Sequence, residues 1–371
     1  MDAPETYIRS YIKTMPGYEP ILPFEVVSDA LGLPIEKIIK LDANENPYGP
    51  LPEVRQTLTE LPFIHIYPDP ESRVLRQAIA DYHHLPVENI LAGAGADELL
   101  DLLMRAFLEP GEAILNCPPT FGMYAFDAEV NRARVISVPR RSDFSLDVEA
   151  IARAIHRKRP KLAFIASPNN PDGSLIPEEV LNRLLSLPVM VILDEAYIEF
   201  APPETSRMRA VLTHPNLVVL RTFSKWAGLA GLRVGYGVFP SWLIAHLWKI
   251  KQPYNVSVAA SAAAVASLRH AGKLLEICQL LLAERERLFR ALQSIPWLYP
   301  YPSQANFILC RVTGLPAQAV KQALAQAGIL VRYFDKPGLQ DHIRISVGKP
   351  EHTDALITEL ERIGAAEDLM D

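Results

Sequence analysis

Cysteine is scarce in this chain of 371 residues, because Cys117, Cys278 and Cys310 are scattered, odd in number and form no C-x-x-C motif. A disulfide scaffold is therefore excluded, and reduced thiols in a cytoplasmic compartment are expected. Long apolar runs are missing too, since the longest, from Val256 to Leu268, is too short and too rich in Ala and Ser to span a bilayer. The first residues show no signal-peptide pattern. These absences predict a cytoplasmic protein without a membrane partner.

Basic tracts are also absent, and the chain carries 37 basic and 43 acidic residues for a net charge of −6. A nucleic-acid partner held by phosphate neutralisation is therefore not expected. The nine histidines form no H-E-x-x-H motif, so no metal site is expected. No G-x-S-x-G motif is present either, which removes the usual hydrolase nucleophile turn.

What the chain does contain is an alternation of short β-branched runs with longer helical patterns. Strands are expected at Ala113–Asn116, Arg134–Val138, Lys161–Ala166, Val189–Leu193, Leu217–Thr222 and Val234–Val238, and helices at Ala96–Leu108, Asp147–Arg157 and Pro177–Ser186. Apolar strands that alternate with helices predict an α/β fold with a mostly parallel sheet buried on both faces.

The pattern changes after about residue 272, where an α+β arrangement begins. A long helix is expected at Leu274–Leu292, strands at Asn306–Val312, Ile329–Tyr333 and His342–Val347, and helices at Pro316–Ala327 and Glu351–Ile363. The first forty or so residues fit no strand–helix rhythm. We therefore expect a large domain at 45–272 and a smaller α+β domain formed by 273–371 together with the N-terminal segment 1–44.

Two turns that follow apolar runs could bind ligands. The sequence LAGAGADELL at 91–100 combines a glycine-rich turn with a helix start, which suits a phosphate, although a tight strand-to-helix turn capped by Asp97 explains it equally well. It lacks the third glycine of the dinucleotide motif. The sequence SPNNPDG at 167–173 would place side-chain amides at the ligand-binding edge of a sheet, but Asn-Pro and Asp-Gly are also ordinary turn residues.

Two charged residues follow other apolar strands. Asp194, at the end of VMVIL, could hold a ring nitrogen protonated, or it could simply form a salt bridge. Lys225 follows LVVLRTFS and could be an amine nucleophile with a lowered pKa, although most lysines are solvated surface charges. Thr222, Ser224 and Arg233 lie close enough in sequence to bind an anionic group beside it.

The order of these motifs resembles that of the fold-type I pyridoxal-phosphate aminotransferases, and most closely the histidinol-phosphate aminotransferase group. The resemblance rests on the sequence motifs LDANENPYGP, IYPDP, CPPTFGMY, SPNNPDG, LDEAYIEF, TFSKWAGLAGLRVGY, QPYNVS and IRISVG. They run from Leu41 to Gly348 and so cover most of the chain. The resemblance implies a large domain with a mixed, mostly parallel sheet between helices, and a smaller α+β domain.

The resemblance also implies roles for single residues. Lys225 would bind pyridoxal 5′-phosphate covalently and then move the proton on the substrate carbon, while Asp194 would pair with the ring nitrogen. Tyr197 and Asn170 would bind the phenolic oxygen of the ring, and Phe121 would stack on the ring. The cofactor phosphate would be bound by Gly95, Ala96, Asp97, Thr222, Ser224 and Arg233.

Further contacts implied by the resemblance involve the substrate and a second subunit. Tyr67 would reach the phosphate of a neighbouring subunit, so a homodimer is expected. Arg344 would grip the substrate carboxylate or phosphate with its planar guanidinium. The remaining candidates for substrate contact are Arg332, Tyr18, Asn46, Tyr254 and Asn255. Two positions depart from the family pattern. Asp172 replaces the threonine that is usual in its turn, and the segment GYEPILPFEVV, which contains Tyr18, differs from the usual family sequence.

The expected activity is transfer of the amino group between L-histidinol phosphate and 2-oxoglutarate in histidine biosynthesis. An aromatic-amino-acid aminotransferase or a phosphothreonine-type decarboxylase on the same scaffold are the alternatives. A non-catalytic protein that keeps the fold is disfavoured, because Lys225, Asp194, Asn170 and Arg233 are all present.

Overall fold

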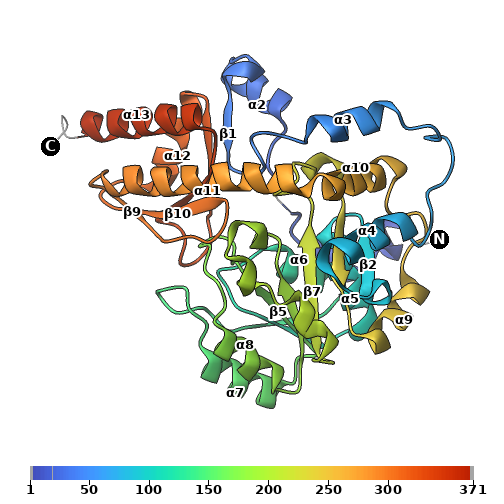
Figure 1. Ribbon diagram of the computed structural model, residues 1–371. Coiled ribbons are helices and arrows are strands. Elements are labelled where there is room, and N and C mark those ends of the chain that lie inside the picture. Colours follow the sequence, from blue (N-terminus) through green and yellow to red (C-terminus); the bar gives the residue numbers. More distant parts are fainter. Residues whose placement is uncertain (1–2, 19, 368–371) are drawn as a thin grey trace.

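The computed structural model describes residues 3–18 and 20–367 and has a seven-stranded sheet at its centre (Figure 1). The strand order is β2-β8-β7-β6-β5-β3-β4. The strands are β2 (Ile90–Gly93), β3 (Ala113–Asn116), β4 (Arg134–Ser137), β5 (Leu162–Ala166), β6 (Met190–Asp194), β7 (Leu217–Thr222) and β8 (Gly235–Val238). β8 runs antiparallel to both of its neighbours, and the other pairs are parallel. The expectation of a mixed, mostly parallel sheet is confirmed.

Helices cover both faces of this sheet, because successive strand residues point to opposite sides. In β6, Val191 and Leu193 join one hydrophobic core and Ile192 joins the other. The first core is completed by α3 (Pro52–Thr59), α4 (Arg73–His83), α7 (Val148–Lys158), α8 (Glu178–Leu185) and α10 (Val258–Arg269). The second contains α5 (Ala96–Phe107), α6 (Met123–Val130) and α9 (Ser241–Ile250). The large unit is thus a sheet between two helical layers.

A second sheet of five strands, in the order β1-β11-β12-β10-β9, forms the smaller unit. Its elements are β1 (Ile39–Leu41), β9 (Leu298–Pro300), β10 (Phe307–Val312), β11 (Ile329–Tyr333) and β12 (His342–Ser346), with α12 (Ala317–Gln326) and α13 (Pro350–Glu367). β1 lies parallel to β11, so the N-terminal segment supplies an edge strand to the C-terminal sheet. On this pairing we propose that 1–44 and 273–371 form one domain and 45–272 the other.

The remaining elements are short, apart from one long helix. They are α1 (Ser10–Thr14), α2 (Phe24–Leu31) and the 3-10 helices Pro4–Tyr7, Ile35–Lys37, Val87–Asn89, Ile198–Phe200, Pro203–Thr205, Met208–Leu212 and Ala230–Leu232. The long helix α11 (Ala271–Gln293) runs across both units (Figure 1). Its Leu274 and Leu281 belong to the first large-unit core, whereas Leu288 and Leu292 belong to the core of the small unit. Across the described ranges, no helix combines the length and the apolarity that a membrane crossing requires.

The sequence-based elements agree with the structure in place and type, but the structure contains further short strands and also helices that were not expected, namely α1, α2, α3, α4, α6, α9 and α10. The strands β1, β2 and β9 are three to four residues long and were not expected. The Ala-rich run from Val256 contains α10, whose small side chains pack closely in the first core. Pro177 caps α8 rather than lying within its first turn.

A buried ion pair connects Arg221 of β7 with Glu195, which follows β6. Glu195 Oε2 accepts hydrogen bonds from Arg221 Nε at 3.0 Å and Nη2 at 2.9 Å. Glu199 Oε1 lies 3.3 Å from Arg221 Nη1. All three side chains are at most 8% exposed, so removal of one partner leaves a buried charge without compensation.

Arg221→Met is therefore expected to lower the free energy of unfolding by about 3–5 kcal/mol, because both carboxylates lose their counterion. The control is Arg105→Met, which breaks an exposed pair with Asp101 and should cost about 0.5 kcal/mol or less. Urea unfolding followed by circular dichroism measures both. Equal losses for the two variants would contradict the assignment of a structural role to the buried pair.

Candidate active site

A cavity of about 370 Å³ opens at the carboxyl ends of β5, β6 and β7. Ligands of open α/β sheets bind at this edge, because the polar strand ends and the turns after them converge there. The lining residues are Ile21, Ala43, Glu45, Ala96, Asp97, Phe121, Ala166, Pro168, Asn170, Asp194, Ala196, Tyr197, Thr222, Ser224, Lys225, Ala230, Gly231 and Arg233. The sequence-predicted candidates for cofactor binding dominate this list.

Lys225 presents its amine to the cavity and donates to the carbonyl oxygen of Ala43 at 3.0 Å. Burial lowers the pKa of Lys225 to about 8, and the nearby Arg344 guanidinium adds to this effect. A substantial fraction of the amine is therefore neutral near physiological pH. A neutral amine in a cavity is a nucleophile toward a carbonyl group, so the surface-charge interpretation of this lysine is excluded.

Asp194 ends β6 with its carboxylate in the cavity and with neutral hydrogen-bond donors around it. Oδ2 accepts from the hydroxyl of Tyr124 at 2.7 Å, and Oδ1 accepts from the backbone N–H of Ala196 at 3.0 Å. Burial raises the pKa of Asp194 to about 6, although the Tyr124 hydroxyl acts in the opposite direction. The adjacent Glu195 makes the salt bridge to Arg221 instead. Asp194 is thus free to pair with a cationic N–H that enters the cavity.

The glycine-rich turn forms a cradle for an anion at the start of α5. Gly95 has a φ of +83°, and a Cβ atom there would lie 2.7 Å from Nη2 of Arg233. This left-handed φ favours glycine at the turn. The hydroxyls of Thr222 and Ser224 lie 2.8 Å apart, and Arg233 Nη2 lies 2.8 Å from Oδ2 of Asp97. Hydroxyls, a guanidinium and a helix N-terminus together match what a phosphate group requires.

Arg344 of β12 is only 5% exposed and has no carboxylate among its hydrogen-bond partners within the described ranges. Nη1 donates to Oδ1 of Asn170 at 2.5 Å, Nη2 donates to the carbonyl of Asp42 at 2.7 Å, and Nε is buried without a partner. Burial lowers the pKa of Arg344 to about 10, but it remains charged. A buried guanidinium with spare donors is a site for an anionic ligand.

None of the other candidates for substrate contact is among the residues that line the cavity. Arg332 pairs with Arg344 in the register of β11 and β12, and Tyr18 packs its ring 5.7 Å from that of Phe126. Asn46, by contrast, is occupied in holding the loop after Lys225, because its amide donates to the carbonyl of Trp226. The structure therefore places Asn46 in a positioning contact rather than in the cavity lining.

Three further candidates, Asn255, Tyr67 and Tyr254, have the following surroundings. Asn255 bonds to Lys251 and Glu98, and Tyr67 is 79% exposed and stacks on Tyr254 with ring centroids 4.8 Å apart. Asp172, the departure from the usual turn, bonds within its own turn to Asn169 and to the N–H of Ser174.

Sequence reasoning missed several residues of the site. Ile21, Ala43 and Glu45 line the cavity, and Tyr124 bonds to Asp194 from within the core. Glu45 belongs to the phrase LDANENPYGP, where its charge was a visible signal. Tyr124 carried no such signal, because nothing in its sequence spacing indicates contact with a strand end 70 residues later.

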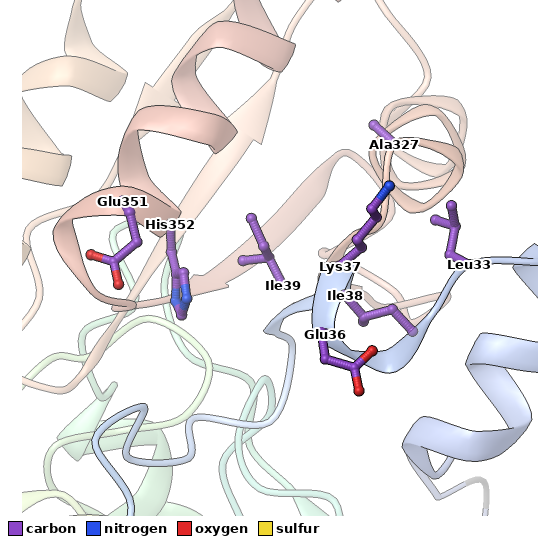
Figure 2. Close-up of a pocket in the computed structure, with 8 residues that line it drawn as sticks. All are labelled: Leu33, Glu36, Lys37, Ile38, Ile39, Ala327, Glu351 and His352. Carbon is purple, nitrogen blue, oxygen red and sulfur yellow. The ribbon is translucent and has the colours of Figure 1, made fainter.

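A second hollow of about 520 Å³ lies in the smaller unit, away from this cavity (Figure 2). Figure 2 shows Glu351 and His352 on one side of it and Leu33, Lys37 and Ala327 on the other. Its charged residues Glu36, Lys37 and Glu351 are exposed, so solvent rather than burial determines their charge states. The chemistry therefore lies in the cavity with Lys225, although the second hollow is larger.

Comparison with known proteins agrees with this assignment. The family model described as "Aminotransferase class I and II" matches residues 36–361. The chloroplastic histidinol-phosphate aminotransferase of Nicotiana plumbaginifolia is 56% identical over 354 residues, which are 95% of this chain and 86% of that protein. The histidinol-phosphate aminotransferase of Roseiflexus castenholzii is 52% identical over 364 residues, 96% of this chain and 98% of that one.

A solved structure is similar over almost its full length. The crystal structure of histidinol-phosphate aminotransferase from Sinorhizobium meliloti, in complex with pyridoxal 5′-phosphate, superposes with a TM-score of 0.88 at 29% identity. The match covers 96% of this chain and 97% of that chain.

Asp194→Asn should stabilise the cofactor-free protein at neutral pH. An acid whose pKa is raised by folding costs nothing below its unfolded pKa of about 3.9, and the cost is complete above its folded pKa of about 6. The variant should therefore be more stable than the parent by about 1–3 kcal/mol at pH 7.5, with the difference shrinking as the pH falls from 6 toward 4. Urea unfolding across this pH range measures it. A less stable variant at pH 7.5 would identify Asp194 as a structural carboxylate.

Proposed function

The chain belongs to the aminotransferase class I and II family, and on that premise we propose that it catalyses L-histidinol phosphate + 2-oxoglutarate ⇌ imidazole acetol phosphate + L-glutamate. This reaction belongs to histidine biosynthesis. The single observation that carries the proposal is the content of one cavity, in which a lysine amine, a buried carboxylate and a phosphate cradle meet. Identities of 52% and 56% with histidinol-phosphate aminotransferases over almost the whole chain specify the substrate.

The cofactor is pyridoxal 5′-phosphate, which when bound accepts the amino group and withdraws electrons from the substrate carbon. The residues of the cavity fit this group. The cradle of Gly95, Ala96 and Asp97 with Thr222, Ser224 and Arg233 would hold the phosphate. Phe121 would lie against the ring, and Asn170 and Tyr197 would donate to its phenolic oxygen. Asp194, which has no cationic partner among the described residues, would keep the ring nitrogen protonated.

Proton transfer is assigned to Lys225. Its pKa of about 8 lets the amine accept a proton from the substrate carbon and return it to another atom with a small free-energy change. The cation of Arg344 contributes to this low pKa, so arrival of an anionic substrate would raise the proton affinity of the lysine. Substrate binding and base strength are thereby coupled.

Arg344 accounts for the acceptance of two unlike amino donors. Glutamate brings two carboxylates, and histidinol phosphate brings a phosphate and no carboxylate. A guanidinium has five N–H donors, of which two are used within the protein. The rest can bind either anion, with Arg332 adding positive charge across the strand pair.

The test of the function is a substrate screen. Holoenzyme is mixed with L-histidinol phosphate, L-glutamate, phenylalanine, tyrosine, aspartate or O-phosphothreonine, and the cofactor absorbance is followed in a single turnover. The fastest change is expected with histidinol phosphate and a change in the reverse direction with 2-oxoglutarate. A faster reaction with aromatic amino acids, or release of carbon dioxide from O-phosphothreonine, would replace the proposal by one of the two alternatives.

Arg344→Lys should weaken both half-reactions by a comparable factor, about ten- to a hundredfold in kcat/KM. The substitution keeps the charge and loses the bidentate fork, which is worth about 1.5–3 kcal/mol. Stopped-flow absorbance measures each half-reaction separately. If only the glutamate half is weakened, the phosphate of histidinol phosphate is bound by other residues, with Arg332 the first to examine.

We also propose that the active form is a homodimer. Exposed apolar side chains gather in the segment that precedes α4, where Phe63, Ile64 and Ile66 are all more than half exposed and Tyr67 follows them. Apolar patches of this kind mark contacts between proteins. Tyr67 does not line the cavity of its own chain, so docking of this segment on a second copy would carry its hydroxyl to the partner's phosphate cradle.

Mixed dimers test this arrangement. Lys225→Ala should be inactive, and Tyr67→Ala should bind the cofactor at least tenfold more weakly. A mixed dimer of the two variants, isolated with two different tags, has both lesions in one site and none in the other. It should therefore recover about half of the activity of the parent. No recovery would place Tyr67 in the site of its own chain.

We place the enzyme in the cytoplasm. The thiols of Cys117, Cys278 and Cys310 are free and buried. Burial raises the pKa of Cys117 and of Cys278 to about 12, so these thiols are protonated and unreactive. A chain whose cysteines are all unpaired suits a reducing compartment.

A further inference from the structure

Asn44 lies at the meeting point of the two domains and uses every polar group it has. Its backbone N–H donates to Oγ of Ser346 at 2.9 Å, and its carbonyl accepts from Nδ2 of Asn306 at 2.9 Å. Its side-chain Oδ1 accepts from the hydroxyl of Ser346 at 2.9 Å, and Nδ2 donates to the hydroxyl of Tyr197 at 3.1 Å. The side chain is 1% exposed, so no water competes for these bonds.

The direction of each hydrogen bond in this cluster is determined by the backbone. Because the N–H of Asn44 donates to Oγ of Ser346, the serine hydroxyl must direct its own proton elsewhere, and Oδ1 of Asn44 receives it. The amide is thereby fixed with Nδ2 toward Tyr197. A tyrosine hydroxyl has one proton, and since its oxygen accepts from Asn44, that proton points away from Asn44.

Tyr197 lines the cavity together with Lys225 and Asp194, whereas Asn44 is not among the lining residues. The amine of Lys225 lies 5.8 Å from the centre of the Tyr197 ring. Charged groups that act on the Tyr197 hydroxyl are Arg344 from β12 and Asp194 and Asp97 from the large domain, in addition to Lys225. Burial raises the pKa of Tyr197, so the hydroxyl stays protonated in the working pH range and keeps a proton to donate.

We propose that Asn44 is the positioning residue for Tyr197: by donating to the hydroxyl oxygen, it directs the hydroxyl proton into the cavity and toward the phenolic oxygen of pyridoxal phosphate. This inference rests on the proposed function, because it requires that the enzyme binds pyridoxal phosphate. Ser346 supports Asn44 by fixing its amide, and both belong to the small domain. Residues of the small domain would therefore affect how strongly the cofactor, held by the large domain, withdraws electrons.

The conformation of Asn44 dictates the variants that test this proposal. Its φ is +56°, a left-handed value that glycine adopts without strain. Asn44→Gly thus removes the two side-chain hydrogen bonds and keeps both backbone ones. Ser346→Ala removes the group that fixes the amide. Arg132→Gly is the matched control, because Arg132 also has a left-handed φ, of +58°, and its side chain is exposed.

The measurement is the absorbance of the resting holoenzyme as a function of pH, without any amino donor. A donor to the phenolic oxygen stabilises its negative charge, so loss of that donor should raise the midpoint of the absorbance change. Tyr197→Phe should raise it by about 1 pH unit, and Asn44→Gly and Ser346→Ala by about 0.5–1 unit. Arg132→Gly should leave it unchanged.

The decisive comparison is a double-mutant cycle. If Asn44 acts through Tyr197, Asn44→Gly should have no further effect on the midpoint in a Tyr197→Phe background. Additive shifts, or a normal midpoint in Asn44→Gly, would overturn the proposal and leave Asn44 with a structural role only. Because the titration requires bound cofactor but no substrate, it is independent of which amino donor the enzyme prefers. A chain that binds no pyridoxal phosphate would contradict the proposed function instead.

Discussion

Three charges buried without counterions in the protein govern this structure. Lys225, Asp194 and Arg344 are all in or beside one cavity, and their hydrogen-bond partners are carbonyls, an amide, a hydroxyl and a backbone N–H. Burial of an unpaired charge costs free energy, and the altered pKa values of these groups report that cost. A ligand that supplies the missing partners recovers this free energy. The free-energy cost of burying these charges therefore favours the binding of a zwitterionic, phosphorylated group.

Side chains at the ends of β6 and β7 alternate between the cavity and a buried ion pair. Asp194 faces the cavity while the next residue, Glu195, forms the buried pair with Arg221, and Thr222 after Arg221 faces the cavity again. Each strand end thus has one residue that lines the cavity, Asp194 or Thr222, and a neighbouring residue in the buried ion pair, Glu195 or Arg221. The ion pair therefore lies at the same strand ends as the unpaired charges, where removal of one of its partners would be costly. A one-residue shift in the register of either strand would exchange these two roles.

The sequence predicted the mixed, mostly parallel sheet well, and most of the residues proposed for cofactor binding line one cavity, because both depend on local patterns. A lysine or an aspartate directly after an apolar strand lies at the sheet edge wherever the strand is placed, and a Gly-rich turn before a helix is readable without tertiary structure. Short edge strands such as β1 could not be predicted, since three residues carry no periodicity. Neither could Asn44 or Tyr124, whose partners lie 302 and 70 residues away in the chain. Asn46 was assigned to the substrate on its motif alone, and its contact with the Trp226 carbonyl became visible only in the fold.

We propose that the two domains contribute different parts of one reaction centre. The large domain supplies Lys225, Asp194 and the phosphate cradle, all of which are held by strands of a single sheet. The small domain supplies Arg344 and, through Asn44 and Ser346, the hydrogen bond to Tyr197. Arg344 also bonds to Asn170 of the large domain, so the residue proposed to bind the substrate anion also forms a contact between the domains. In this proposal, substrate recognition and the direction of the Tyr197 proton both depend on residues of the small domain that hydrogen-bond to the large domain.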